Sequence, residues 1–227
     1  MRKYMPRRFV RFVNDGFYHI LNRSIYPNKL FLEESNYAKA IDTLNYYRFS
    51  KVPFSFSRLK QLHPAQQSSI LAELRKNPQL VAVIGFCLMP NHVHLLLKQK
   101  MDFGISRFIA NFQNSYTRYI NIKNERKGYV FEGTFKAVSV VSDAQLIHTY
   151  RYIILNPYSS GIVKKIDNIE KYPYSSLIEY ANPEKYNVSD TAYMLDRFGS
   201  YENLKNFIQD NAEHQKAFEK IKHLVLD

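Results

Sequence analysis

The spacing of hydrophobic and polar residues divides most of the chain into predicted strands and helices. Alternating or continuously apolar segments predict strands at residues 16–24, 80–88, 91–98 and 129–141. Apolar residues three and four positions apart predict helices at 33–49 and 105–120. This order gives the split β-α-β-β-α-β plan. We therefore predict an α+β protein with a ferredoxin-like antiparallel sheet, helices on one face, and one further helix after the last strand.

The remaining segments differ in character from this regular series. The prediction divides the chain into a basic N-terminal arm (1–15), a main domain (16–180) and a helical C-terminal extension (181–227). A polar, proline-containing insertion at about 51–77 interrupts the main domain, and one short helix is expected there at 64–76. The extension begins near the Asn182-Pro183 linker and predicts two or three short helices.

The stretch 77–97 contains no acidic residue, lysine or arginine and has the length of a membrane span. Met89-Pro90-Asn91-His92 interrupts it near the middle, so two strands joined by a turn explain it better. The basic N-terminus is not followed by an apolar segment of a signal peptide. With Cys87 as the single cysteine, a disulfide framework is excluded. These observations predict a cytoplasmic protein without a membrane partner.

Composition narrows the classes of partner. The 227 residues carry a formal net charge of +12, which favours a polyanionic partner, with nucleic acid first and an anionic membrane surface second. The sequence also has 18 tyrosines and 16 phenylalanines, whose rings can stack on unpaired bases. Eight basic residues are candidates for phosphate contacts: Arg7, Arg8, Arg11, Arg118, Lys123, Arg126, Lys127 and Lys136.

Two histidines stand two positions apart in the predicted strand 91–98. On a strand, residues at i and i+2 project from the same face, so the imidazoles of His92 and His94 are expected side by side, with Val93 in the core. Neutral imidazole is a common metal ligand, and two histidines leave coordination positions for a substrate. Two surface histidines without a metal remain the alternative.

The helix that follows the last strand contains a second candidate group. Ser142-Asp143 has the character of an N-cap, and the helix is expected to end at Asn156-Pro157. At about 100° per residue, Tyr152 falls opposite the apolar stripe of this helix. Asn156 lies one turn after Tyr152 and His148 one turn before it. An ordinary surface tyrosine is the alternative interpretation.

Several motifs in this order resemble those of the single-tyrosine HUH transposases (transposase IS200-like), and in particular the REP-associated tyrosine transposase branch. The resemblance covers about residues 16–180. Its landmarks are Phe17-Tyr18-His19-Ile20, Asn22-Arg23-Ser24, Leu88-Met89-Pro90-Asn91-His92-Val93-His94-Leu95-Leu96, Phe131-Glu132-Gly133, Phe135-Lys136, Arg151-Tyr152-Ile153, Asn156-Pro157, Gly161-Ile162-Val163, Tyr172-Pro173-Tyr174-Ser175-Ser176 and Tyr180.

The resemblance implies an enzyme that cleaves and rejoins single-stranded DNA at imperfect hairpins, during DNA transposition and recombination. It implies Tyr152 as the nucleophile, which forms a 5′-phosphotyrosine, and His92, His94 and Asn156 as ligands of Mg²⁺ or Mn²⁺. His148 is a candidate for proton transfer from its helical position alone. Tyrosines on apolar stripes are ranked lower as nucleophiles, namely Tyr116, Tyr119 and Tyr150.

Two other functions stay open. A hairpin DNA- or RNA-binding protein without turnover would share the charge and the aromatic residues, and a water-using metallophosphodiesterase would not need Tyr152. The sequence departs from the family at Thr134 and at Tyr158-Ser159-Ser160, where basic residues are usual, which bears on DNA specificity. The C-terminal extension could grip DNA, form a homodimer or cover the sheet.

Overall fold

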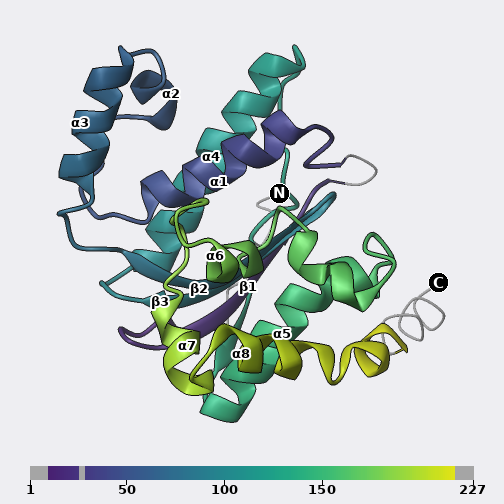
Figure 1. Cartoon of the computed structure of the whole chain (residues 1–227). Helices are drawn as coiled ribbons and strands as arrows, with labels where there is room; N and C mark the ends of the chain where they lie inside the picture. Colours follow the sequence, from purple (N-terminus) through teal and green to yellow (C-terminus); the bar gives the residue numbers. More distant parts are fainter. Residues whose placement is uncertain (1–9, 26–28, 218–227) are drawn as a thin grey trace.

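A four-stranded antiparallel sheet forms the centre of the protein (Figure 1). The computed structural model describes residues 10–25 and 29–217. The strands lie in the order β2-β3-β1-β4, with a long helix between β1 and β2 and another between β3 and β4. Their bounds are β1 (Phe17–Arg23), β2 (Val81–Met89), β3 (His92–Gln99) and β4 (Lys136–Val140). This is the predicted split β-α-β-β-α-β plan, so the α+β fold class is confirmed.

Two helices cover one face of the sheet, as predicted. They are α1 (Glu34–Tyr47) and α4 (Gly104–Lys123), which pack against each other. Alternate strand residues, among them Ile20, Val93 and Leu95, join them in one apolar core. Each of these three side chains is at most 2% exposed, so this face is dry.

The opposite face is covered as well, and here the prediction of helices on one face was wrong. Helix α5 (Asp143–Ser159) packs on β2 and β3 and forms a second apolar core with the sheet. The physical reason lies in β2, where every position from Val81 to Met89 is buried. A strand that is apolar at successive positions exposes hydrophobic side chains on both faces and therefore needs cover on both.

Helix α5 approaches β2 closely at Gly85. A Cβ atom built on Gly85 would lie 2.8 Å from two ring carbons of Tyr150. The pairing of β2 with β3 also shifts register between Val83 and Gly85, which marks a β-bulge. The missing side chain at this position therefore allows α5 to lie at its observed height above the sheet.

Side-chain hydrogen bonds explain where α5 begins and why it continues through Pro157. At its start the Ser142 hydroxyl accepts a hydrogen bond from the Gln145 amide, which confirms the predicted N-cap. The predicted end at Pro157 was wrong, because the helix continues to Ser159. Proline has no N–H for the carbonyl of Ile153 four residues earlier. The side-chain nitrogen of Asn156 lies 3.4 Å from that carbonyl and donates to it instead.

The last strand is shorter than predicted. The segment 129–141 was expected to be a strand, but β4 begins only at Lys136, and a loop precedes it. Gly133 in this loop has a φ of +37°, which interrupts extended structure. The loop is nevertheless attached to the end of β1, where the Glu132 amide donates to the carbonyl of Arg23 and Phe131 bridges Ser24.

The insertion and the C-terminal extension surround this core. The insertion forms two helices rather than one, and Figure 1 shows them at one side of the molecule, away from the sheet. In the extension, Met194, Leu204 and Ile208 join the core beneath α5, so apolar packing continues across the predicted division at residue 180. The remaining elements are α2 (Phe56–Leu59), α3 (Pro64–Leu74), η1 (Ile166–Lys171), α6 (Leu177–Ala181), α7 (Ala192–Phe198) and α8 (Tyr201–Gln209).

The charge-free stretch 77–97 forms β2, a turn and most of β3, as predicted. None of the helices in the described part of the chain has both the length and the apolar character needed to cross a bilayer.

Candidate active site

Strand β3 places His92 and His94 on the face that α5 covers. Their ring centroids are 4.8 Å apart, and the ring planes are nearly perpendicular. His92 is half-buried and His94 is buried, at 3% exposed. Val93 between them enters the core beneath α1 and α4, as the alternation predicts. The predicted side-by-side arrangement of the two imidazoles is therefore confirmed.

A third histidine, which the sequence analysis did not single out as a site residue, completes this group. His19 on β1 has its Nε2 2.8 Å from Nδ1 of His94, and the two rings stack with centroids 5.1 Å apart. β1 pairs directly with β3, with Leu21 opposite His94. His19 is two residues from Leu21 and therefore lies on the same face. The sequence signal for His19 is therefore the alternation of side chains along β1, combined with the pairing of β1 with β3.

Tyr152 approaches the histidines from α5. Its ring centroid is 5.7 Å from that of His94 and 6.0 Å from that of His19, and both contacts are edge-to-face. The sequence analysis placed Tyr152 on the side of the helix away from the core, and this was wrong. The buried surface of α5 is wider than the predicted stripe, because the sheet and the C-terminal extension both cover it, and Leu155 is also fully buried.

Asn156, one turn after Tyr152, is buried at 8% exposed. Its side-chain nitrogen donates to the carbonyl of Tyr152 at 2.8 Å as well as to that of Ile153. These two bonds orient the amide, since an amide nitrogen only donates and its oxygen only accepts. The oxygen Oδ1 is thus the atom of Asn156 with ligand chemistry.

Burial sets the charge of the imidazoles. It lowers the pKa of His19 to about 4. It also lowers the pKa of His94 well below its ordinary value, and the neighbouring His92 adds to this effect. Both rings are therefore neutral at neutral pH, which is the state that binds metal ions.

Hydrogen bonds also bear on which ring nitrogen carries the proton. Nδ1 of His92 lies 2.7 Å from Oδ1 of Asn91, and an amide oxygen can only accept, so His92 Nδ1 donates. A neutral His94 presents a lone pair on Nε2 when its Nδ1 proton is donated to His19. In these tautomers both Nε2 atoms have the electron pair that a metal requires.

The histidine pair fits an ion with an open coordination shell better than a closed protein cage. Among residues 10–25 and 29–217, no group of three or more histidine, cysteine or acidic side chains is placed to hold a metal. Two imidazoles and one amide oxygen would leave several positions for water or phosphate oxygens. Oxygen-rich shells of this kind suit Mg²⁺ or Mn²⁺.

His148 contacts other side chains of the described residues than those of this group. Its Nδ1 lies 2.8 Å from Nη2 of Arg151, and its ring packs against Phe207 of α8. His148 is exposed on the side of α5 that faces the extension. A role in proton transfer therefore remains a prediction from helical position.

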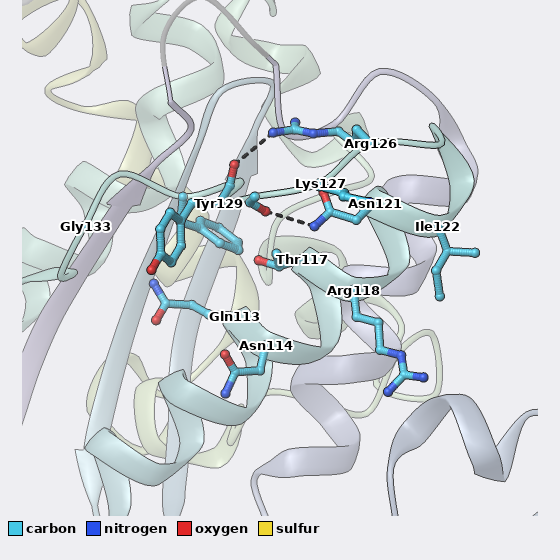
Figure 2. A pocket seen from close by; sticks show the side chains of 12 residues that line it. Gln113, Asn114, Thr117, Arg118, Asn121, Ile122, Arg126, Lys127, Tyr129 and Gly133 are labelled. Carbon is cyan, nitrogen blue, oxygen red and sulfur yellow. Dashed lines mark hydrogen bonds between the residues drawn. The ribbon is translucent and has the colours of Figure 1, made fainter.

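The basic candidates occupy different places. Arg11 and Lys136 are exposed, whereas Arg7 and Arg8 lie outside the described residues. Lys123 forms an ion pair with Glu33 at 2.8 Å and ties α4 to the start of α1. The other three line an open groove beside the C-terminal half of α4, shown in Figure 2: Arg118, Arg126 and Lys127.

A ferredoxin-like sheet with a His-x-His pair facing a helical tyrosine has the layout expected of a single-tyrosine HUH protein. Residues 58–156 match the family model described as transposase IS200 like, and this range includes His92, His94, Tyr152 and Asn156. The resemblance to the IS200-like transposases is thereby confirmed. His19 precedes the matched range.

A solved structure has the same fold. It is the REP-associated tyrosine transposase bound to a REP hairpin, with a TM-score of 0.53 and 13% sequence identity. The similarity covers 81% of this chain and 90% of that one. Comparison with curated proteins gave no match.

Proposed function

We propose that the protein is a hairpin-DNA transposase that cleaves and rejoins single-stranded DNA through Tyr152. The observation that carries this proposal is the meeting of the Tyr152 ring with the rings of His19 and His94, from three different elements. The family match over residues 58–156 supports it, and so does the shared fold with a transposase bound to a REP hairpin.

The proposed step is a transesterification. The Tyr152 phenol loses its proton to water as its oxygen attacks a backbone phosphorus. The bond from phosphorus to the 3′ oxygen breaks, and that oxygen takes a proton and leaves as a 3′-hydroxyl. The other strand end stays attached as a 5′-phosphotyrosine. Attack by a second 3′-hydroxyl reverses the step without ATP, because one phosphodiester replaces another.

The chain's own residues would hold a divalent ion, Mg²⁺ or Mn²⁺, at His92, His94 and Oδ1 of Asn156. When bound, such an ion withdraws charge from the scissile phosphate and orients it for in-line attack. His19 fixes the ring of His94 through the 2.8 Å contact. The hydrogen bonds from the Asn156 nitrogen to the carbonyls of Tyr152 and Ile153 hold its oxygen in one orientation.

Phosphate contacts are assigned to basic side chains at the surface. Arg11, Arg118, Lys127 and Lys136 are all exposed. Arg7 and Arg8 stay predictions. A cytoplasmic location and a homodimer stay predictions too, since the extension is seen to cover α5 and this packing is compatible with either oligomeric state.

The test is a denaturing gel of the full chain with hairpin oligonucleotides from the flanks of its own gene, labelled at either end, with and without Mn²⁺. Wild-type protein is expected to carry the 3′-end label, because the fragment on the 3′ side of the break is the one joined to Tyr152 through its 5′ phosphate. Tyr152→Phe should lose the adduct by at least about 1,000-fold and still bind the DNA. Tyr158→Phe is the matched control. It removes a tyrosine hydroxyl from the same helix, but this hydroxyl donates to Glu213.

Other outcomes separate the alternatives. Cleaved DNA without an adduct, unchanged in Tyr152→Phe, would indicate a water-using phosphodiesterase. Binding without cleavage, across several hairpins and with both metals, would indicate a DNA-binding protein without turnover. Loss of DNA binding in Tyr152→Phe would mean that this tyrosine has a structural role.

A further inference from the structure

A groove beside α4 has the properties of a second nucleic-acid site. It lies between the C-terminal half of α4 and the loop that leads to β4, and its volume is about 680 Å³, enough for one nucleotide. Figure 2 shows its walls: Gln113, Asn114 and Thr117 from the helix, and Tyr129 from the loop. This groove was not part of the predicted active site.

Tyr129 is the most unusual side chain of the groove. It is 82% exposed, although most of the chain's aromatic side chains are buried or half-buried. Ile122, also on the groove wall, is 69% exposed. Tyr129 lies on the loop wall and Ile122 on the helix wall, and an exposed aromatic ring of this kind can stack on the face of an unpaired base.

The groove also carries positive charge. Arg118 and Lys127 are exposed on it, and Arg126 is half-buried. Glu125 and Glu132 are its acidic neighbours in the loop, but neither is among the lining residues. Side chains that can hydrogen-bond to base edges, the amides of Gln113 and Asn114, lie on the helix wall. Charge for phosphate, a ring for stacking and amides for a base edge are the combination that a nucleotide requires.

Hydrogen bonds hold the loop wall of the groove in place, as Figure 2 shows. Arg126 donates to the carbonyl of Tyr129 at 2.9 Å. Asn121 of α4 donates to the carbonyl of Gly128 at 2.8 Å. The loop is thereby tied to the helix, so little ordering is required when a ligand binds.

The groove is connected to the candidate active site through β1. The loop that forms its wall is bonded to the end of β1, with the Glu132 amide donating to the carbonyl of Arg23. Arg23 is paired with His92 in the sheet and is exposed. Arg23 is thus an exposed cation that adjoins both the strand of His92 and the loop of the groove.

We propose that this groove binds one unpaired nucleotide of the DNA strand, with its base stacked on Tyr129 and its phosphate held by Arg118 and Lys127. The proposal rests on the proposed function, because it assumes that DNA is the substrate. It adds a subsite for unpaired DNA on the α4 side of the sheet, apart from the chemistry of Tyr152.

The test measures binding of two fluorescent hairpins by anisotropy, one with three unpaired nucleotides on each side of the stem and one with a blunt end. Tyr129→Ala should weaken binding of the tailed hairpin by about tenfold and of the blunt hairpin by less than twofold. Tyr129→Phe keeps the ring and should bind both like wild type. Lys127→Ala should weaken the tailed hairpin and lower the slope of its salt dependence by about one.

A second measurement separates this proposal from the proposed function. Tyr129→Ala should form the Tyr152 adduct more slowly at low concentrations of the tailed hairpin, and the rate should rise as the DNA concentration is increased. If it binds the tailed hairpin like wild type while Tyr152→Phe loses the adduct, the groove proposal is wrong and the transposase function stands. Equal weakening of both hairpins would also overturn the groove proposal, because Tyr129 would then contact the duplex. Failure of the wild type to bind either hairpin would overturn both.

Discussion

Both faces of the sheet are packed with apolar side chains, but the packing beneath α5 also brings reactive side chains from separate elements together. Beneath α1 and α4, the buried hydroxyls of Tyr116 and Tyr46 donate to the backbone carbonyls of Leu30 and Phe54. Beneath α5, the imidazole of His94 bonds to another side chain, that of His19. The first pattern stabilises one conformation of the chain, whereas the second aligns reactive groups from separate elements.

This difference predicts that substitutions beneath α5 lower activity, whereas substitutions beneath α1 and α4 lower stability alone. The largest effect is expected for His94→Ala, which removes a proposed metal ligand and should lower metal-dependent adduct formation by at least about 100-fold. The measurement is the rate of adduct formation over a series of Mn²⁺ concentrations, and a chelator should reproduce the loss in wild type.

Val93→Ala is the matched control, since Val93 is adjacent but points into the core beneath α1 and α4. It should lower the free energy of unfolding by about 1–2 kcal/mol and leave the rate per folded molecule unchanged. If both variants lost adduct formation equally, the division between the two faces would be wrong.

His19 provides a more graded test, because it acts on the proposed metal through His94. His19→Ala should weaken Mn²⁺ binding by about 10- to 100-fold, so that a higher Mn²⁺ concentration restores the rate. His19→Gln keeps an oxygen that can accept the proton of His94 Nδ1 and should recover part of the affinity. A purely structural role would instead lower the maximum rate or the stability without changing the Mn²⁺ dependence.

On the other face, Tyr116→Phe should affect stability alone. The Tyr116 hydroxyl is 2.7 Å from the carbonyl of Leu30, and its loss leaves a buried acceptor unpaired. We expect the free energy of unfolding in urea to fall by about 1–2 kcal/mol. The rate of adduct formation, measured where both proteins are folded, should be unchanged. A large loss of activity would give Tyr116 a role in catalysis, as one of the alternative nucleophiles.

The smallest effect concerns Lys39 of α1, whose ammonium lies 4.2 Å from the ring centre of Phe56. Burial lowers the pKa of Lys39 to about 8, from 10.5 in its ordinary state. Between these values the unfolded chain keeps a proton that the folded chain has lost, so stability should rise with pH across this window. Because Lys39 is only half-buried, the rise should stay below about 1 kcal/mol.

The measurement is the free energy of unfolding of wild type and Lys39→Met from pH 7 to pH 10. The difference between the two proteins cancels the titration of other groups. The advantage of the methionine variant should be largest at pH 7 and disappear toward pH 10. A constant difference would mean that the ammonium of Lys39 is solvated in the folded state.

Local patterns in the sequence predicted the elements well and the contacts between them less well. Alternation along one strand was enough to place His92 and His94 on one face. His19 was missed as a site residue because its relation to His94 depends on the register of β1 against β3, which no single segment contains. Tyr152 was placed on the wrong side of its helix because a helical stripe does not show how many neighbouring elements will cover it.

The ends of elements failed for a related reason. Proline predicts the end of a helix from the loss of one N–H, but the side chain of Asn156 supplies a donor to the affected carbonyl. The segment 129–141 has the composition of a strand, but Gly133 adopts a positive φ and Phe131 pairs with Ser24 only through an isolated bridge. In both cases one local interaction outweighed the propensity of the segment.

Gly85 has neither charge nor hydrogen-bonding side chain, and it lies on a different strand from all three histidines. Because it sets the height of α5, it also sets how far the phenol of Tyr152 stands above the imidazoles. A single methyl group added at Gly85 would press against the ring of Tyr150 and push α5 away from the sheet. The nucleophile would then move, although no reactive atom had been altered. The distance between the Tyr152 phenol and the imidazoles, and with it the reaction rate, can therefore be changed at a position that takes no part in the chemistry.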